Sequence, residues 1–430
     1  MHYHFSTFLS GSGCALAFRD LVYLVIAAPH RPSSEKDIVM LNKYRLLTPG
    51  PTPLPDRVRL AMARDMIHHR KPDFKAILAE TQSGLARLFG TSQTVLPLSS
   101  SGTGGMVAAV CNLFMPGEKV LVVNGGKFAE RWLNICKTHQ VETVTIDVPW
   151  GQAVAPAAVA AALDADKDIR GVLVQHSETS TGVQHSVQEI AAITRNRDTL
   201  LVVDGISAVS ITPCPMDDWG IDCLVTGSQK GLMLPPGLAP IALSERAWVK
   251  AEQMPNRNFY FNLPKERVST AKGETCFTPP ISLFFGLAES LRMFEEVGME
   301  SIYRKQWALT MMARTSVKAL GLTLFAPEKF AWGLTSVLLP EGIDSVRLLA
   351  HAAKKYDVIM AAGQDHLKTR IVRIGHMGWV DYADLAAGIH ALAGSYTAVG
   401  GHIDCRNYLE QGLDAYWAAL EQGYPRVKTV

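Results

Sequence analysis

Long apolar runs and an excess of one charge are both missing from this sequence. The longest apolar stretch near its start, residues 21–28, is far shorter than the roughly 20 residues that a membrane-spanning helix needs. Lys and Arg number 42 against 40 Asp and Glu, a net charge of +2, and no block of like charge occurs. The sequence therefore indicates neither a membrane protein nor a nucleic-acid-binding protein.

Cysteine is scarce as well. The seven cysteines are scattered over 430 residues without a CxxC pair or a metal-like Cys/His spacing. An odd, sparse set is typical of reduced thiols rather than of a disulfide framework or a metal site. We therefore expect a cytoplasmic protein without a bound metal. The GxGxxG and GK[ST] motifs of nucleotide-binding folds are also absent.

The composition that is present, 48% hydrophobic, 19% charged and 8% aromatic, excludes a disordered chain, a collagen-like repeat and a coiled coil. A chain of this length is typical of two or three domains with a large core. Strong patterning begins only at about residue 40. We therefore expect residues 1–39 to be an extension outside the fold.

From about residue 94, short β-rich apolar runs alternate with segments of helical period. This alternation predicts an α/β fold whose mainly parallel sheet lies between two layers of helices. The loops that follow the strands then lie along one edge of the sheet. The expected strands are 94–98, 119–123, 141–148, 171–175, 200–203 and 223–226. The expected helices are 104–114, 127–138, 156–163 and 187–195.

A second, smaller α+β region is expected after Pro279 and Pro280. Its predicted elements are helices at 282–296, 299–320, 345–356 and 382–392, and strands near 332–338 and 370–374. The domains that we predict are an N-terminal arm with the large domain (40–298), a small C-terminal domain (299–394) and a tail (395–430) with one more helix at 408–420.

Four polar features follow predicted strands. They are the Ser/Gly loop 99–105, the loop 176–182, Asp204 and Lys230. The Ser/Gly loop precedes a helix and is a candidate phosphate site. Asp204 ends an apolar strand, and a lysine in a sheet crevice is suited to Schiff-base chemistry. Pyridoxal phosphate requires phosphate donors, a carboxylate for its ring nitrogen and a lysine.

These motifs resemble those of the class V, fold-type I, pyridoxal-phosphate aminotransferases of the alanine/serine–glyoxylate group. The resemblance covers residues 44–395. It runs through LLTPGPTPLP (46–55), SSSGTGG (99–105), NGGKFAERW (124–132), HSETSTGV (176–183), VVDGISAV (202–209), GSQKGLMLPPG (227–237), FTPPIS (277–282) and VRIGHMG (372–378).

The resemblance implies a role for each matching residue. Lys230 resembles the lysine that binds the cofactor and moves the substrate proton, and Asp204 resembles the partner of the ring nitrogen. Arg373 is similar to the arginine that holds the substrate carboxylate, and Gly50 to a wall of the substrate pocket. Phe128 matches the aromatic that stacks on the cofactor ring. The other cofactor-binding residues implied are Ser101, Gly102, Thr103, Thr179, Gln229 and Thr278.

The resemblance also implies a homodimer with shared active sites, in which Thr278 reaches the neighbouring subunit's phosphate. Thr275 is a departure, because some members have a tyrosine there that contacts the same phosphate. No second arginine for a distal carboxylate is evident apart from Arg70, which favours small amino donors.

The implied activity is a ping-pong transfer of an amino group from alanine or serine, with aspartate as a further donor, to glyoxylate or pyruvate. The substrates are then a small amino acid and a 2-oxo acid. Three alternatives remain at this point: a lyase or desulfurase on the same scaffold, a transaminase for an aminophosphonate, and, from another class, a nucleotide-binding oxidoreductase or binding module.

Overall fold

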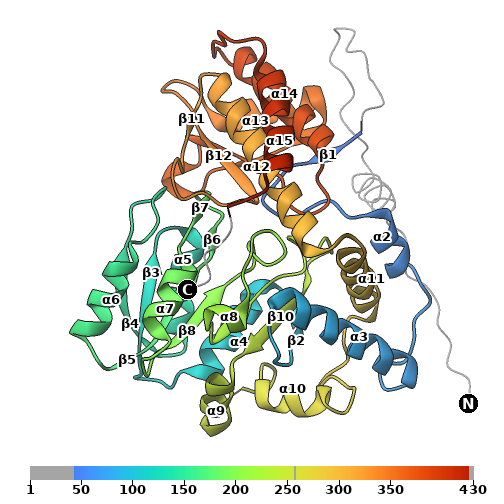
Figure 1. The fold of residues 1–430 in the computed structure, drawn as a ribbon, viewed down its shortest axis with the longest axis vertical. Helices are drawn as coiled ribbons and strands as arrows, with labels where there is room; N and C mark the ends of the chain where they lie inside the picture. The colour runs from blue at the N-terminus through green and yellow to red at the C-terminus, as the bar shows by residue number, and fades with distance from the viewer. Residues whose placement is uncertain (1–42, 256–257, 426–430) are drawn as a thin grey trace, which may run out of the picture. The chain divides into compact units, whose positions relative to one another are not determined.

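The computed structural model describes residues 43–255 and 258–425. The extension predicted for residues 1–39, and the end of the predicted tail, residues 426–430, lie outside the described residues. From Tyr44 onward the chain forms one unit, with a large N-terminal part and a smaller C-terminal part (Figure 1).

A seven-stranded sheet forms the centre of the large part. Its order is β2 (Leu96–Ser100), β10 (Gly237–Leu243), β9 (Cys223–Val225), β8 (Leu200–Asp204), β5 (Ile169–Gln175), β3 (Lys119–Asn124) and β4 (Glu142–Asp147). The pairs from β9 to β4 are parallel. All six predicted strands are present, so the α/β prediction is confirmed.

Strand β10 is absent from the prediction. It runs antiparallel between β2 and β9, with Pro240 opposite Pro97. A proline inside an apolar run argues against a strand, because it cannot donate a hydrogen bond to its neighbour. Here the Pro240 carbonyl still accepts from Thr226 N. Pro240 faces Thr226, which lies one residue beyond the end of β9, so the missing donor falls where the β9–β10 ladder ends.

Both faces of the sheet are covered by helices, as the alternation of β3 shows. Leu121 and Val123 pack into one apolar cluster, and Val120 and Val122 into another. The first cluster includes α3 (Pro72–Phe89), α6 (Pro156–Ala165), α7 (Val187–Thr194) and α11 (Ile281–Val297). The second includes α4 (Gly102–Leu113), α5 (Lys127–Thr138) and α9 (Glu245–Gln253).

The C-terminal part is an antiparallel sheet with four helices. The strand order is β11 (Thr323–Leu324), β12 (Leu334–Leu338), β15 (Ile371–Gly375) and β14 (Ala361–Ala362). The helices are α12 (Met299–Ala319), α13 (Ser345–Tyr356), α14 (Tyr382–Ala398) and α15 (Tyr408–Gln422). Strand β1 (Arg45–Leu46) pairs with β13 (Val358–Ile359), which ties the start of the described chain to this part. The domain boundaries themselves remain a prediction.

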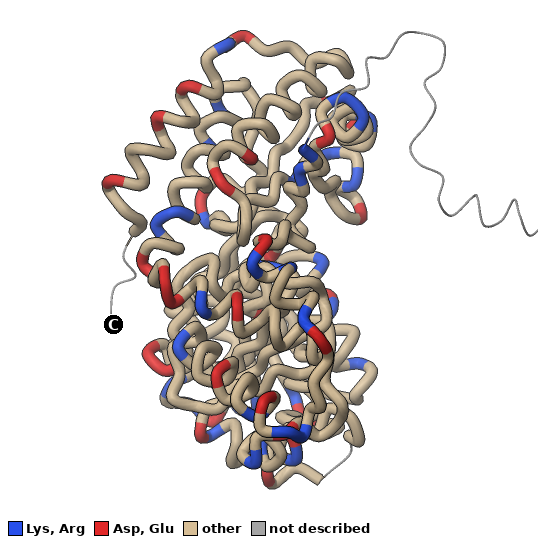
Figure 2. The backbone as a smooth tube through the Cα atoms, turned by 90° about the vertical axis from the view of Figure 1, so that its right-hand side faces the viewer, with Lys and Arg blue, Asp and Glu red and all other residues tan. Residues whose placement is uncertain are grey.

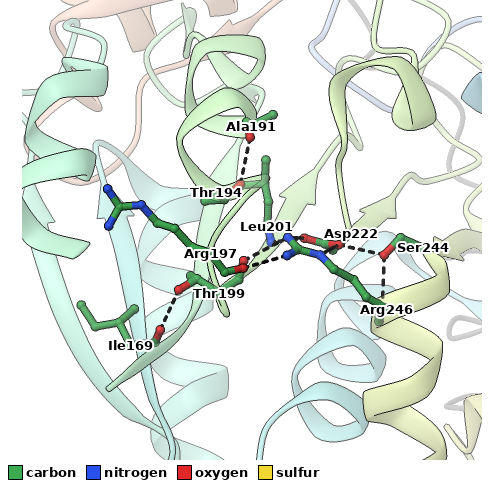
Figure 3. Close-up of polar contacts among 10 residues, drawn as sticks. Ile169, Ala191, Thr194, Arg197, Thr199, Leu201, Asp222, Ser244 and Arg246 are labelled. Atoms are coloured by element: carbon green, nitrogen blue, oxygen red, sulfur yellow. Dashed lines mark hydrogen bonds and ion pairs between the residues drawn. The ribbon is translucent and has the colours of Figure 1, made fainter. Parts of the chain in front are cut away.

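An ionic network holds the amino ends of β8 and β9 (Figure 3). Asp222, 2% exposed, accepts hydrogen bonds from Leu201 N, Ser244 Oγ and the Arg246 guanidinium. Arg246 also donates to the Arg197 carbonyl. Each acceptor oxygen is satisfied inside the fold, so this buried carboxylate is a structural group at the edge of the sheet opposite to Asp204.

Acidic and basic residues are interspersed along the described backbone, in keeping with the small net charge (Figure 2). The cysteines of the described ranges form no disulfide with one another. Among the described helices, none combines the length and hydrophobicity needed to cross a bilayer. No group of three metal-ligating side chains occurs within residues 43–255 and 258–425.

Candidate active site

The carboxylate at the end of β8 lies deep in the sheet edge. Asp204 is 5% exposed and accepts a hydrogen bond from Ile206 N at 2.9 Å. Burial raises the pKa of Asp204 to about 6, and the positive charges of Arg131 and Lys230 act against this rise. With this pKa the carboxyl is mostly ionised at neutral pH, and a protonated ring nitrogen would complement its charge.

Lys230 follows β9 and lies beside the turn that carries Gly50. Its Nζ donates to the Pro49 carbonyl, and a Cβ built on Gly50 would lie 2.4 Å from that nitrogen. Burial lowers the pKa of Lys230 to about 8, and the charge of Arg373 lowers it further while Asp204 opposes the shift. The amine is therefore easily deprotonated and is held against a wall that only glycine leaves room for.

The N-terminus of α4 follows the Ser/Gly loop for which the sequence predicts a phosphate site. Its N-cap, Ser101, makes no side-chain capping hydrogen bond, so this side chain does not occupy the helix N–H groups that could bind an anion. The Ser101 carbonyl accepts from Gly104 N at 2.8 Å, as expected at a helix start. Gly102 packs so closely that a Cβ would lie 2.5 Å from Ile206 Cδ1. Since Ile206 N also binds Asp204, this packing fixes the helix start relative to the carboxylate.

Phe128 stands at the first turn of α5, and a buried acid holds its backbone. Glu178, fully buried, accepts from the N–H groups of Phe128 and Ala129 at 3.1 Å and from Ser180 N and Oγ. Burial raises the pKa of Glu178 to about 7, and the hydrogen bonds from Ser180 and Ala129 lower it. Glu178 thus caps α5, whose N-cap Gly126 has no side chain to do so.

Sequence reasoning gave Glu178 no role. Its acidic type within the otherwise neutral loop 177–182 was a usable signal, because a carboxylate in a buried loop requires several donors. The helix that supplies two of those donors lies about fifty residues earlier in the chain, which a local pattern does not reveal.

The loop of Glu178 also binds the substrate arginine predicted from the sequence. Arg373 in β15 is 8% exposed, and it donates to the Thr179 carbonyl and the Ala362 carbonyl, each at 2.8 Å. Burial lowers the pKa of Arg373 to about 10, and the charge of Glu178 raises it. The C-terminal part thus supplies a guanidinium next to the loop that holds Phe128.

A second arginine, Arg131, also belongs to this cluster. It donates from Nη1 to Thr103 Oγ1 at 2.7 Å, and its guanidinium carbon lies 4.8 Å from the centre of the Phe128 ring. Phe128 and Arg131 are three residues apart on one helix, a spacing that places both side chains on the same face.

Three further residues singled out from the sequence, Gln229, Thr278 and Thr275, differ in burial and in their partners. Gln229 has a buried Oε1 with no hydrogen-bond partner in the described part of the chain. Thr278 is exposed and lines a surface depression together with Ser99, Ser100 and Ser101. Thr275, where the sequence departs from the family pattern, is buried and donates to the Phe277 carbonyl at 2.7 Å.

Comparison with known proteins completes the description of the site. The profile of the Aminotransferase class-V family matches residues 54–379. A protein named the small subunit of a soluble hydrogenase, from Synechococcus, is 38% identical over 84% of this chain and 95% of its own length. The L-aspartate–glyoxylate aminotransferase of Paracoccus denitrificans is 34% identical over 81% of this chain and 90% of its own. The alanine–glyoxylate aminotransferase structure from Nostoc has a TM-score of 0.79 at 26% identity, covering 84% of this chain and 97% of its own.

Proposed function

This chain belongs to the class-V aminotransferases, and we propose that it uses pyridoxal 5′-phosphate to move an amino group from alanine or serine to glyoxylate or pyruvate. The observation that carries this proposal is the convergence of an amine of low pKa, a buried carboxylate and an open helix N-terminus at one edge of the sheet. Aspartate, the donor in the name of the Paracoccus relative, is a further candidate.

The residues present fit this cofactor. The helix N-terminus at Ser101 suits a phosphate, Asp204 suits a protonated ring nitrogen, and Lys230 suits an aldehyde carbon. The buried Gln229 Oε1 has no hydrogen-bond partner in the described part of the chain, so the Gln229 amide can still bond to a ligand. When bound, the cofactor supplies an aldehyde that captures amines and a ring that accepts electrons from the substrate.

The chain's own residues bind, orient and deprotonate the substrate in this proposal. Arg373 holds the α-carboxylate, which a planar guanidinium can bind through two parallel hydrogen bonds. Lys230 Nζ would take the proton from the substrate Cα and hold it for return. Gly50 keeps the opposite wall clear of side-chain atoms. Holding the carboxylate and the reacting carbon at fixed positions is the main contribution of the site.

We include a homodimer and a cytoplasmic location in the proposal. The exposed Thr278, beside the phosphate turn, is available to a second subunit. The cysteines of the described ranges form no disulfide with one another, which fits a reducing compartment. A desulfurase is disfavoured, because burial raises the pKa of Cys223 and raises that of Cys276 to about 11, which suppresses the reactive thiolate.

The direct test of this function is amino transfer between single substrate pairs. Purified protein supplied with pyridoxal 5′-phosphate and glyoxylate is given ¹⁵N-labelled alanine, serine or aspartate in turn, and labelled glycine is measured by mass spectrometry. Labelled glycine from at least one donor supports the proposal. Release of sulfide or ammonia from amino acids, without labelled glycine, contradicts it and favours the lyase alternative.

Replacing Arg373 by lysine is expected to raise the KM for the amino donor about 30-fold or more, because lysine cannot form the two-pronged bond to a carboxylate. The fold decrease in the turnover number should be smaller than the fold increase in the KM. Arg314, 7% exposed and bonded to the Ala326 and Pro327 carbonyls, is a matched buried arginine away from the site. If Arg314→Lys raises the KM equally, the effect is one of general destabilisation.

The low pKa of Lys230 predicts how the free protein captures its cofactor. Only the neutral amine attacks an aldehyde, so the capture rate should rise about tenfold between pH 6 and pH 7 and level off above about pH 8. Stopped-flow absorption measures this rate, with Nα-acetyl-lysine as the unshifted control. A rate that keeps rising through pH 10, as for the control, would contradict the shifted pKa.

A further inference from the structure

Arg131 has no part in the mechanism above, although it lies among the residues assigned to the cofactor. It is half-buried on α5 and makes two contacts that reach different elements. One is the hydrogen bond from Nη1 to Thr103 Oγ1, and the other is the stacking of its guanidinium 4.8 Å from the Phe128 ring.

These contacts join the two walls of the proposed cofactor site. Thr103 lies in the first turn of α4, where the phosphate is expected, and Phe128 lies in the first turn of α5. The guanidinium lies over the Phe128 ring, and a planar cofactor ring would stack on the opposite face. Glu178 holds the Phe128 backbone, and the Arg131 guanidinium contacts its ring.

We propose that Arg131 is a positioning residue for the cofactor, whose single guanidinium sets the Phe128 ring against the cofactor ring and the Thr103 hydroxyl at the phosphate turn. This inference rests on the proposed use of pyridoxal 5′-phosphate. In the mechanism Arg131 contacts neither the substrate nor the reacting atoms. Its effect is transmitted through the side chains of Phe128 and Thr103.

The positive charge of Arg131 also favours cofactor binding, through its effect on two pKa values. It lowers the pKa of Asp204 and that of Lys230, with Arg373 as the other cation that faces the lysine. A charged Asp204 and a neutral Lys230 are the forms that complement a protonated ring nitrogen and an aldehyde. The charge therefore supports the same cofactor that the contacts position.

The test compares Arg131→Gln and Arg131→Lys as purified holoenzymes. Equilibrium dialysis against a series of pyridoxal 5′-phosphate concentrations measures the Kd, and visible circular dichroism per bound cofactor measures ring orientation. Arg131→Gln should raise the Kd about tenfold or more and change the dichroic band, because it loses both the charge–ring contact and the charged hydrogen bond. Arg131→Lys keeps the charge and should lie between Arg131→Gln and wild type.

Arg267→Gln is the matched control. The Arg267 guanidinium lies 4.5 Å from the Trp248 ring and pairs with Glu252, so its loss removes the same kind of stacking outside the site. It should leave both the Kd and the dichroism unchanged. Wild-type Kd and dichroism in Arg131→Gln, or equal changes in Arg267→Gln, would overturn the inference. Failure of the wild-type protein to bind the cofactor at all would instead overturn the proposed function.

Discussion

Replacing Lys230 by alanine is expected to lower the turnover of amino transfer by about a thousandfold or more, because one side chain both captures the cofactor and moves the Cα proton. The surroundings of Lys230 support this dual use. Its amine is held by the Pro49 carbonyl, faces the glycine wall of Gly50 and has a pKa lowered by burial to about 8. Steady-state kinetics with each donor measure the loss.

Two further measurements distinguish lost chemistry from lost folding in this variant. Methylamine is small enough to enter the space that the side chain leaves, and it should restore part of the turnover of Lys230→Ala. Lys305 offers a matched control, since it is a second lysine whose pKa burial lowers, and its Nζ donates to the Gly378 carbonyl at 3.4 Å. Lys305→Met should stay within about threefold of wild type. Near-wild-type transfer by Lys230→Ala would refute the assignment.

The second large effect is expected at Asp204. Replacement by asparagine should lower the turnover number by about 100- to 1,000-fold, because an amide cannot stabilise the positive charge that the ring nitrogen carries in the reaction. Asparagine has nearly the same shape, and its carbonyl oxygen can still accept the hydrogen bond from Ile206 N. The KM for the donor should therefore change little, which separates this effect from a loss of substrate binding.

The control for Asp204→Asn is Asp222→Asn, at the opposite edge of the same sheet. Asp222 is equally buried but is bonded to Arg246, Ser244 and Leu201. Its replacement should lower the melting temperature, because it leaves the Arg246 guanidinium without its anion, and it should spare the turnover number. If the two variants lose turnover to the same extent, burial alone explains the effect and Asp204 has no special role.

The sequence was most informative where structure depends on local pattern. Helix α5 and helix α13 begin and end at the predicted residues, because their apolar periods and flanking residues are strong. Strand β10 is absent from the prediction, since Pro240 argues against a strand, and only the fold shows that its carbonyl pairs with Thr226 N at the end of β9. The pairing of β1 with β13 joins residues three hundred positions apart, beyond the reach of any local signal.

The same distinction applies to the site. Asp204 and Lys230 could be singled out from the sequence because Asp204 ends β8 and Lys230 lies in the loop after β9, and parallel strands bring their carboxyl ends to one edge. Arg131 and Glu178 depend on partners in other segments, Thr103 and the first turn of α5, and so acquire a role only in the folded chain. Arg131 contacts the Phe128 ring and Glu178 accepts from the Phe128 N–H. The role of Phe128 itself was already implied by the resemblance.

The most direct test of the central proposal is a half-reaction in the absence of any oxo acid acceptor. The purified protein, loaded with pyridoxal 5′-phosphate, is mixed with a single amino acid while visible absorption and released 2-oxo acid are recorded. The account predicts loss of the visible band and one 2-oxo acid per bound cofactor with alanine, serine or aspartate, followed by recovery of the band on addition of glyoxylate. A band that none of these amino acids alters, with no 2-oxo acid released, would contradict it.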